Sequence, residues 1–346
     1  MDLDYAEFEE LGRVTAKYKS SKSAKVSMRR FRAHFGVPPD VVVCAWELLT
    51  ESKCLRDRLR EVGRTPPNPT HYLWALMSLK QHPTWPVLAT ALNVDEDTAR
   101  KWCLLHLEAN AELDSEVACG LLLVCLIMLH LFCLIWLSAN LQFPHCLLQI
   151  VWANRLVGDT LDLALVTVDG THFRIKNRRN SFTGKHVKRW HSHKFKQAGV
   201  SYEVAVCIKT GDIVWIHGPF PAATHDLSIF RYGLKAKLLP HELVLADRGH
   251  VGDKKCRTPR NALNCQHKRA MAALRARHET VNRRFKTFGS LQHAFRLNPN
   301  LHHTFFRSVA VLIQLSQQNG YSHYDVVGYI DPACEAEWDA GDERSV

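Results

Sequence analysis

Apolar and polar positions follow two different patterns along the second half of this 346-residue chain. Short apolar runs bounded by turn residues are typical of buried strands. Four such runs predict strands at 163–169, 202–208, 213–217 and 243–247. Thr224-His225-Asp226 precedes another apolar stretch and predicts the start of a helix, while a longer helical pattern covers 268–288.

The order of these elements predicts the fold class. Three strands, a helix, a strand and a helix form the order of a ribonuclease H-like α/β domain, with a mixed sheet and flanking helices. In that arrangement the first and fourth strands lie side by side and parallel. Asp169 and Asp247 end these two strands, so we expect them to be neighbours although 247 − 169 = 78 positions separate them.

The first third of the chain has helical periodicity instead. It predicts three short helices at 72–80, 86–92 and 95–107. Asp95 or Asp97 is available to cap the last of them. The spacing is that of a helix-turn-helix, which would place three DNA-facing residues at the start of a recognition helix: Thr98, Arg100 and Lys101. A small three-helix packing module has the same pattern, so a purely structural role stays open.

These patterns divide the chain into two predicted domains. We expect a small helical, helix-turn-helix-like DNA-binding domain over 27–114 and the α/β domain over 151–325, with an apolar insert at 115–150. The terminal segments 1–26 and 326–346 are polar or charged and are expected to be flexible.

Three carboxylates carry the candidate chemistry. Glu279 is the only acidic residue from Lys254 to Tyr324, a stretch that holds thirteen lysines and arginines. Together with Asp169 and Asp247 it forms an acidic trio typical of nucleases, whose hard oxygen ligands suit two Mg²⁺ or Mn²⁺ ions roughly 3.5–4 Å apart. Taken singly, each residue has another explanation, as a turn former, a helix cap or a surface ion pair.

Asp226 is a further acidic residue near the predicted site. It is a candidate fourth metal ligand, but Thr224-His225-Asp226 before an apolar helix also matches an N-terminal cap made by Thr224 or Asp226. We favour the cap. His225 and His250 are candidates to position phosphate or water, but we interpret them as hydrogen-bonded structural residues.

The charge of the chain indicates an anionic partner. Its formal charge is +11 and its pI about 9.2, and from Asp169 to Thr210 there are ten basic residues but only two acidic ones. Interleaved with Trp190, this mixture favours DNA phosphate contact and stacking. The predicted DNA-binding residues of this domain are Arg178, Arg179, Lys185, Lys188, Arg189, Lys194, Lys196 and Arg283. A solvated surface or a nuclear localisation patch would have the same composition.

One segment does not suit a DNA enzyme. No aspartate, glutamate, lysine or arginine occurs from Val117 to Asn154, and the run at 117–137 is long enough to cross a bilayer core of about 30 Å. Three explanations are kept, in this order: a translated intron or gene-model error, a buried helix, and a membrane anchor. An anchor would separate the two predicted domains by a bilayer, so membrane association is ranked last.

Four long motifs occur in order: TVDGTHFRI, SHKFKQAGVSYEVAVCIKTGDIVWIHGPFPAATHDLSIFR, VLADRGHVGDKKCRTP and ETVNRRFKTFG. Together they resemble the DDE endonuclease domain of PIF/Harbinger superfamily transposases, over 150–325 and more weakly over 27–107. The resemblance places the family's two aspartates and its glutamate on Asp169, Asp247 and Glu279. It also matches the family's histidine-aspartate pair to His225-Asp226, while His250 stands where the family usually has a tyrosine.

This resemblance implies a specific function. It implies a metal-dependent nuclease in the nucleus that cuts DNA at the ends of an element and joins the 3′-OH to target DNA. It also implies a Myb-like DNA-binding partner protein, and a homo-oligomer is left open. The alternative is a domesticated, non-catalytic DNA-binding or adaptor protein derived from a transposase, although the intact carboxylates favour the enzyme.

Overall fold

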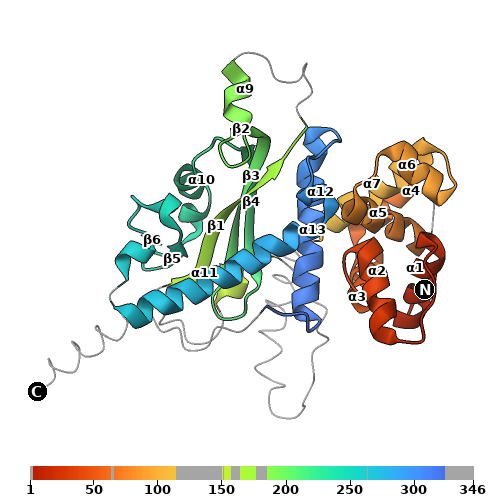
Figure 1. The fold of residues 1–346 in the computed structure, drawn as a ribbon, viewed down its shortest axis with the longest axis horizontal. Coiled ribbons are helices and arrows are strands. Elements are labelled where there is room, and N and C mark those ends of the chain that lie inside the picture. The colour runs from red at the N-terminus through yellow and green to blue at the C-terminus, as the bar shows by residue number, and fades with distance from the viewer. Residues whose placement is uncertain are drawn as a thin grey trace, which may run out of the picture. The chain divides into compact units, whose positions relative to one another are not determined.

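The computed structural model of the chain describes residues 3–63, 66–113, 150, 152–156, 164–176, 185–262 and 264–323. These residues form two compact units (Figure 1). The helical unit comprises residues 1–151, 287–290 and 304–320, and the α/β unit comprises 152–286, 291–303 and 321–346. The helical unit therefore takes in two short segments that the sequence places within the α/β domain.

The helical unit is built mainly from the first third of the chain. Its helices there are α1 Tyr5–Ala16, α2 Ala24–Phe35, α3 Pro39–Glu51, α4 Lys53–Glu61, α5 Pro69–Gln81, α6 Trp85–Leu92 and α7 Glu96–Glu112. The middle of α5 is buried on all sides, which makes it the central helix of this unit. Most of α13, which spans His302–Gln318, also belongs here.

The three helices predicted at 72–80, 86–92 and 95–107 are present as α5, α6 and α7. Asp95 caps α7, because its side chain accepts a hydrogen bond from the backbone N of Thr98 over 2.8 Å. The expectation of a flexible segment over 1–26 is wrong for part of that range. Residues 5–16 form α1, whose fully buried Phe8 packs edge-on against Trp46, so an apolar contact holds this helix to the core.

The α/β unit contains a mixed sheet. Its strands are β1 Ala164–Arg174, β2 His191–Ser192, β3 Gln197–Cys207, β4 Ile213–Pro221, β5 Leu243–Ala246 and β6 Cys256–Arg257. The order is β2-β3-β1-β5-β6, and β4 pairs with β3. β1 pairs antiparallel with β3 and parallel with β5, as expected for the first and fourth predicted strands. This mixed sheet with flanking helices confirms the ribonuclease H-like fold class.

Helices and short 3-10 turns complete the α/β unit. They are η1 Trp152–Arg155, α9 Lys185–Trp190, α10 Asp226–Tyr232, η2 Leu234–Lys237, η3 Arg248–His250, η4 Pro259–Asn261, α11 Cys265–Phe285, α12 Gly289–Gln292 (shared with the helical unit) and η5 Pro299–Leu301. α10 is shorter than the apolar run predicts. It ends at Tyr232 and is followed by the cap residue Gly233, where a Cβ would lie 2.3 Å from the ring of His217, so only glycine fits.

The two faces of the sheet pack against different helices (Figure 1). Phe230 of α10 and Leu234 of η2 pack with Val166 and Val168 on one face. Met271 and Leu274 of α11 pack with Leu245 on the other. Because side chains alternate along a strand, Asp169 faces the same side as Thr167, whose Oγ1 lies 2.8 Å from Nδ1 of His278 on α11.

In the described residues, no helix is long and apolar enough to cross a membrane. The apolar run at 117–137 and the acidic segment at 326–346 lie outside the residues that the structure describes.

Candidate active site

Asp169 lies where the parallel pairing of two strands ends. Parallel pairing between β1 and β5 runs as far as Val168 opposite Ala246. β1 itself continues beyond the predicted end, to Arg174, because it stays paired with β3. The Asp169 carboxylate accepts two hydrogen bonds, at Oδ1 from the backbone N of Gly170 over 2.8 Å and at Oδ2 from Nδ2 of Asn282 over 2.9 Å.

Asp247 follows β5 at the same edge of the sheet and caps the short turn η3. Its Oδ1 accepts hydrogen bonds from the backbone N of Gly249 over 2.8 Å and from Nδ1 of His250 over 2.9 Å. The bond from His250 is the main cause that holds the pKa of Asp247 below its usual value, and the charge of Arg275 adds to it.

His250 is 1% exposed and supports Asp247 from below the surface. Burial alone lowers the pKa of this imidazole, but the hydrogen bond to Asp247 and the nearby carboxylates outweigh burial and leave the pKa raised. The expectation of a hydrogen-bonded role for His250 is therefore met, and its partner is one of the trio.

Glu279 is an exposed residue of α11, three positions before Asn282. Its charge reaches Asp169, whose pKa is raised to about 6 by burial and then by the charges of Asp247 and Glu279. Asp247 and Glu279 are thus both within electrostatic range of Asp169.

The donor set of this trio suits a hard divalent cation. The three side chains offer only carboxylate oxygens, and their mutual repulsion at Asp169 is the kind of excess negative charge that a bound cation neutralises. Among the described residues, however, no three histidine, cysteine, aspartate or glutamate side chains already form a cluster that could hold a metal ion. The match between these three residues and a divalent cation therefore rests on their charge and on their oxygen donors.

Asp226 does not cap α10, which corrects the preferred sequence interpretation. The cap is His225, whose Nδ1 accepts a hydrogen bond from the backbone N of Leu227 over 3.2 Å. The extended backbone of His225 directs its ring to that N–H, whereas Asp226 already belongs to the helix.

The Asp226 carboxylate lies instead between the segments that follow Asp169 and Asp247. A Cβ on Gly170 would lie 2.4 Å from its Oδ1, and one on Gly249 would lie 3.3 Å from its Oδ2. Oδ1 is buried without a hydrogen-bond partner among the described residues, and Nε2 of His172 is 3.9 Å away. An unsatisfied buried carboxylate oxygen is costly, so its position beside the trio calls for a functional explanation.

Sequence reasoning missed a buried carboxylate beside Gly170, that of Glu203. This residue of β3 pairs with Gly170 and is 2% exposed. Its Oε1 accepts a hydrogen bond from Nε1 of Trp215 over 3.0 Å, while burial raises its pKa to about 7. The only available signal was a glutamate within the otherwise apolar run at 202–208.

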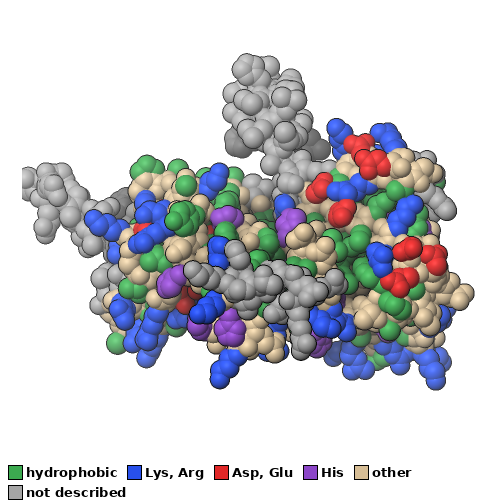
Figure 2. All heavy atoms as spheres, turned by 90° about the horizontal axis from the view of Figure 1, so that it is seen from above, with side chains coloured by type: hydrophobic (Ala, Val, Ile, Leu, Met, Phe, Trp, Pro, Cys, Tyr) green, Lys and Arg blue, Asp and Glu red, His purple; other side chains and the backbone are tan. Residues whose placement is uncertain are grey.

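Basic side chains border the carboxylates. The positive charge of Lys194, on the β2–β3 hairpin, acts on Asp169. Lys and Arg side chains spread over the α/β unit, on the left of Figure 2, where few acidic side chains are visible. Among the predicted DNA-binding residues of this unit, five are exposed: Lys188, Arg189, Lys194, Lys196 and Arg283. Arg178 and Arg179 lie outside the described residues, as does the side chain of Lys185.

The predicted recognition helix has its own internal ion pairs. Arg100 contacts Glu96 at 2.5 Å and Asp97 at 3.2 Å, both on α7. The Nζ of Lys101 lies 5.1 Å from the ring centre of Trp102. DNA contact by this helix would therefore compete with existing partners.

Comparison with known proteins bears on the α/β unit. Residues 168–316 match the sequence model of a family described as DDE superfamily endonuclease. No curated protein and no solved structure matches the chain. The matched segment begins beside Asp169 and includes Asp247 and Glu279. Together with the ribonuclease H-like sheet, this similarity to DDE superfamily endonucleases supports a transposase-like nuclease.

Proposed function

We propose that the chain is a divalent-metal-dependent DNA endonuclease and strand transferase of the DDE type, which cuts DNA at element ends and joins the 3′-OH to target DNA. One observation carries the proposal. Asp169 and Asp247 follow the paired parallel strands β1 and β5 at one edge of the sheet, where Asp169 is half-buried, and desolvation together with the charges of Asp247 and Glu279 raises its pKa to about 6. Carboxylates that repel one another beside basic residues are a pattern that favours a cation site for phosphodiester chemistry.

Asp169, Asp247 and Glu279 are the residues proposed to hold Mg²⁺ or Mn²⁺, with two ions expected. Asp226 is the proposed fourth ligand, because its buried Oδ1 has no other partner among the described residues. When bound, such cations stabilise the negative charge on the attacking and leaving oxygens of the phosphodiester.

The chain's own residues orient the carboxylates and attract the substrate. Asn282 fixes one oxygen of Asp169, and His250 fixes one oxygen of Asp247. Such supporting hydrogen bonds limit the rotation of ligand side chains. Lys194 draws the phosphate backbone toward Asp169. The nucleophile is water or a DNA 3′-OH, so no covalent enzyme intermediate forms.

The finer assignment rests on the sequence motifs. Their resemblance to PIF/Harbinger transposases supports a nuclear protein that acts with a Myb-like DNA-binding partner. The helix-turn-helix-like helices are proposed to add DNA contacts through Arg100 and Lys101.

A non-catalytic descendant of a transposase is the second candidate. The observation that favours it is the residue type at position 250, beside Asp247, where the similar family usually has a tyrosine and this chain has His250. In that case the basic surface binds DNA while the carboxylates no longer serve cleavage.

A nicking assay separates the two candidates. The full chain is incubated with supercoiled plasmid and with labelled duplexes that carry candidate element ends, in Mg²⁺, Mn²⁺ or EDTA. The enzyme proposal predicts nicking in Mg²⁺ or Mn²⁺ that EDTA abolishes. DNA binding without nicking in either metal would support the non-catalytic candidate.

A further inference from the structure

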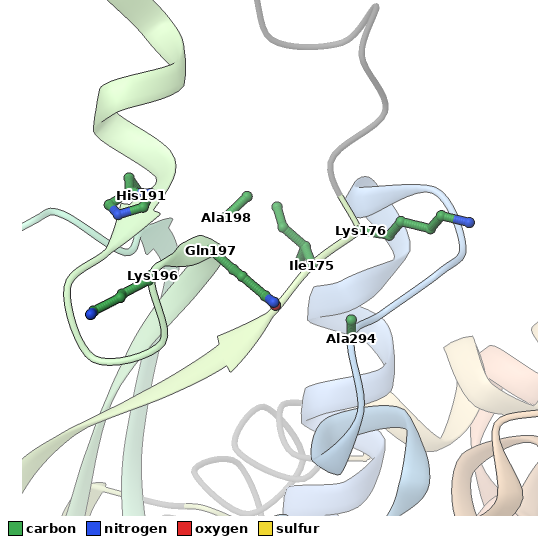
Figure 3. Close-up of a pocket in the computed structure, with 7 residues that line it drawn as sticks. All are labelled: Ile175, Lys176, His191, Lys196, Gln197, Ala198 and Ala294. Carbon is green, nitrogen blue, oxygen red and sulfur yellow. The ribbon is translucent and has the colours of Figure 1, made fainter.

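A groove of about 390 Å³ lies in the α/β unit where β1 ends, beside the β2–β3 hairpin (Figure 3). Its volume is within the range of about 300–1,000 Å³ that is usual for small-ligand sites. Apolar side chains of Ile175, Ala198 and Ala294 line its middle. None of the proposed catalytic carboxylates lines it, so the groove is a separate feature of this unit.

The apolar middle of the groove is held in place by backbone hydrogen bonds on both sides. The N–H of Ile175 donates to the carbonyl of Ala198 over 3.0 Å, which ties it to β3. On its other side Ile175 bridges to Phe295, and the N–H of Lys176 donates to the carbonyl of Phe295 over 2.8 Å. The surface is therefore already formed without a ligand.

The rims of the groove are basic. Lys176 and Lys196 extend from opposite sides of it, and His191 stands at the start of the hairpin (Figure 3). None of the lining residues is acidic. Two amines that flank an apolar surface suit a ligand with an apolar face and negative charges at its ends.

Lys196 also has an unfavourable backbone conformation. Its φ is +53°, in the left-handed region that favours glycine or asparagine. Its N–H donates to the carbonyl of Ser192 over 2.8 Å and closes the hairpin turn. Strained residues that persist in this way are concentrated at functional sites. A lysine at this position therefore destabilises the folded hairpin relative to glycine, which adopts this φ without strain.

The hairpin links the groove to the carboxylates. Lys194, two residues before Lys196, acts on Asp169. A polymeric anion at Asp169 is therefore within the electrostatic reach of this hairpin. Bases of a duplex keep their faces stacked on one another, whereas an unpaired base exposes a face that can rest on the partly exposed side chains of Ala198 and Ala294.

We propose that this groove binds a nucleotide of an unpaired DNA strand, next to the phosphodiester that the carboxylate trio would cleave. The base lies on the apolar middle and the flanking phosphates contact Lys176 and Lys196. The inference rests on the proposed function, since it names the form of DNA that the same site takes.

Binding in EDTA tests the groove without requiring catalysis. Fluorescence anisotropy of the full chain compares a duplex with splayed, unpaired arms against a blunt duplex of equal length. Lys196→Asn removes the amine but keeps a residue that tolerates positive φ, and Ala294→Glu places a negative charge in the groove. Lys237→Asn, on the exposed turn η2, is the matched control for loss of one positive charge.

The wild type is expected to prefer the splayed duplex. Lys196→Asn and Ala294→Glu should each weaken binding of the splayed duplex by about tenfold, with blunt-duplex binding changed by about twofold or less. Lys237→Asn should bind both as the wild type does. The melting temperature of Lys196→Asn should equal or exceed that of the wild type, because the substitution relieves backbone strain.

Three results would overturn the inference. In the first, both groove variants bind DNA as Lys237→Asn does. In the second, they lose affinity for the blunt and the splayed duplex equally. In the third, polyglutamate displaces the splayed duplex from the wild type and from Lys196→Asn alike, which would indicate a site for acidic polymers in general. If the wild type cuts DNA but the groove variants bind the splayed duplex as the wild type does, the inference about the groove fails and the proposed function stands. If no DNA binds at all, the proposed function fails with it.

Discussion

Asn282 donates a hydrogen bond from Nδ2 to Oδ2 of Asp169 over 2.9 Å, although the two residues are 113 positions apart. The bond joins β1 to α11, the helix that also carries Glu279. It therefore fixes the first carboxylate of the trio relative to the third. This makes Asn282 a positioning residue of the candidate active site, a role that the sequence analysis did not assign to it although it lies within the motif ETVNRRFKTFG.

Replacing Asn282 with alanine should impair cleavage without abolishing it. Removing a supporting residue of this kind typically lowers activity or metal affinity by about 10–100-fold. Loss of the hydrogen bond also lowers the free energy of unfolding by about 1 kcal/mol. Cleavage rates across a Mg²⁺ titration measure the first effect and thermal melting the second. An unchanged rate at every Mg²⁺ concentration would show that the bond is only structural.

His250 should act on Asp247 in the same way. His250→Phe keeps a ring in the buried site but removes the Nδ1 donor to Oδ1 of Asp247. The Mg²⁺ concentration needed for half-maximal cleavage should rise by about 10–100-fold. His250→Tyr provides an O–H donor and the residue that the similar family usually has, so its rate should stay nearer the wild type. Equal loss in both variants would point to packing rather than hydrogen bonding.

The raised pKa of Asp169 predicts a pH-dependent stability in metal-free protein. Between its unfolded pKa of 3.8 and its folded pKa of about 6, the folded chain holds a proton that the unfolded chain releases. The contribution of Asp169 to the free energy of unfolding is full below about pH 4 and is lost as the pH rises through about 6. The shift corresponds to at most about 3 kcal/mol.

The test is the difference in melting temperature between Asp169→Asn and the wild type, measured in EDTA from pH 5 to pH 8. Buried histidines such as His278, whose burial lowers its pKa to about 3, act in the opposite sense and cancel in this difference. Asp169→Asn should gain stability relative to the wild type as the pH rises, and Mg²⁺ at pH 7 should reverse that gain. A difference that stays constant with pH would contradict the repulsion between these carboxylates.

The helical unit is predicted to contact DNA through the start of α7. Arg100→Ala combined with Lys101→Ala should weaken DNA binding and reduce the slope of its salt dependence. Because Arg100 already pairs with Glu96 and Asp97, Lys101→Ala alone is expected to account for much of the effect. Binding that is unchanged at several salt concentrations, with an unchanged melting temperature, would assign this module a structural role.

The order and type of the main elements could be predicted because strand and helix periodicities are local properties of the sequence. The adjacency of Asp169 and Asp247 followed from a single rule of topology, the parallel pairing of β1 with β5. The extension of β1 to Arg174 was not predictable from its apolar run, since its far half is held by β3 rather than by its own pattern.

Other features depend on tertiary packing that the sequence does not display. A cap and a ligand have the same signature at Asp226, and only the backbone of His225 shows that Asp226 is not the cap. Glu203 is buried because Trp215 and the neighbouring strands surround it. The left-handed conformation of Lys196 is likewise a property of the hairpin turn rather than of the residue type.

The central claim is that Asp169, Asp247 and Glu279 act together on a divalent cation, and the cleavage rate of Glu279→Gln tests it most directly. Glu279 is exposed, so glutamine there should leave folding and EDTA-resistant DNA binding unchanged. Asp226→Asn serves as a comparison, and we expect it to lose less activity than Glu279→Gln. The account predicts that Glu279→Gln lowers Mg²⁺-dependent cleavage by orders of magnitude, with no further loss when Asp169→Asn is added. Cleavage at the wild-type rate by Glu279→Gln would contradict the account and place the third ligand elsewhere.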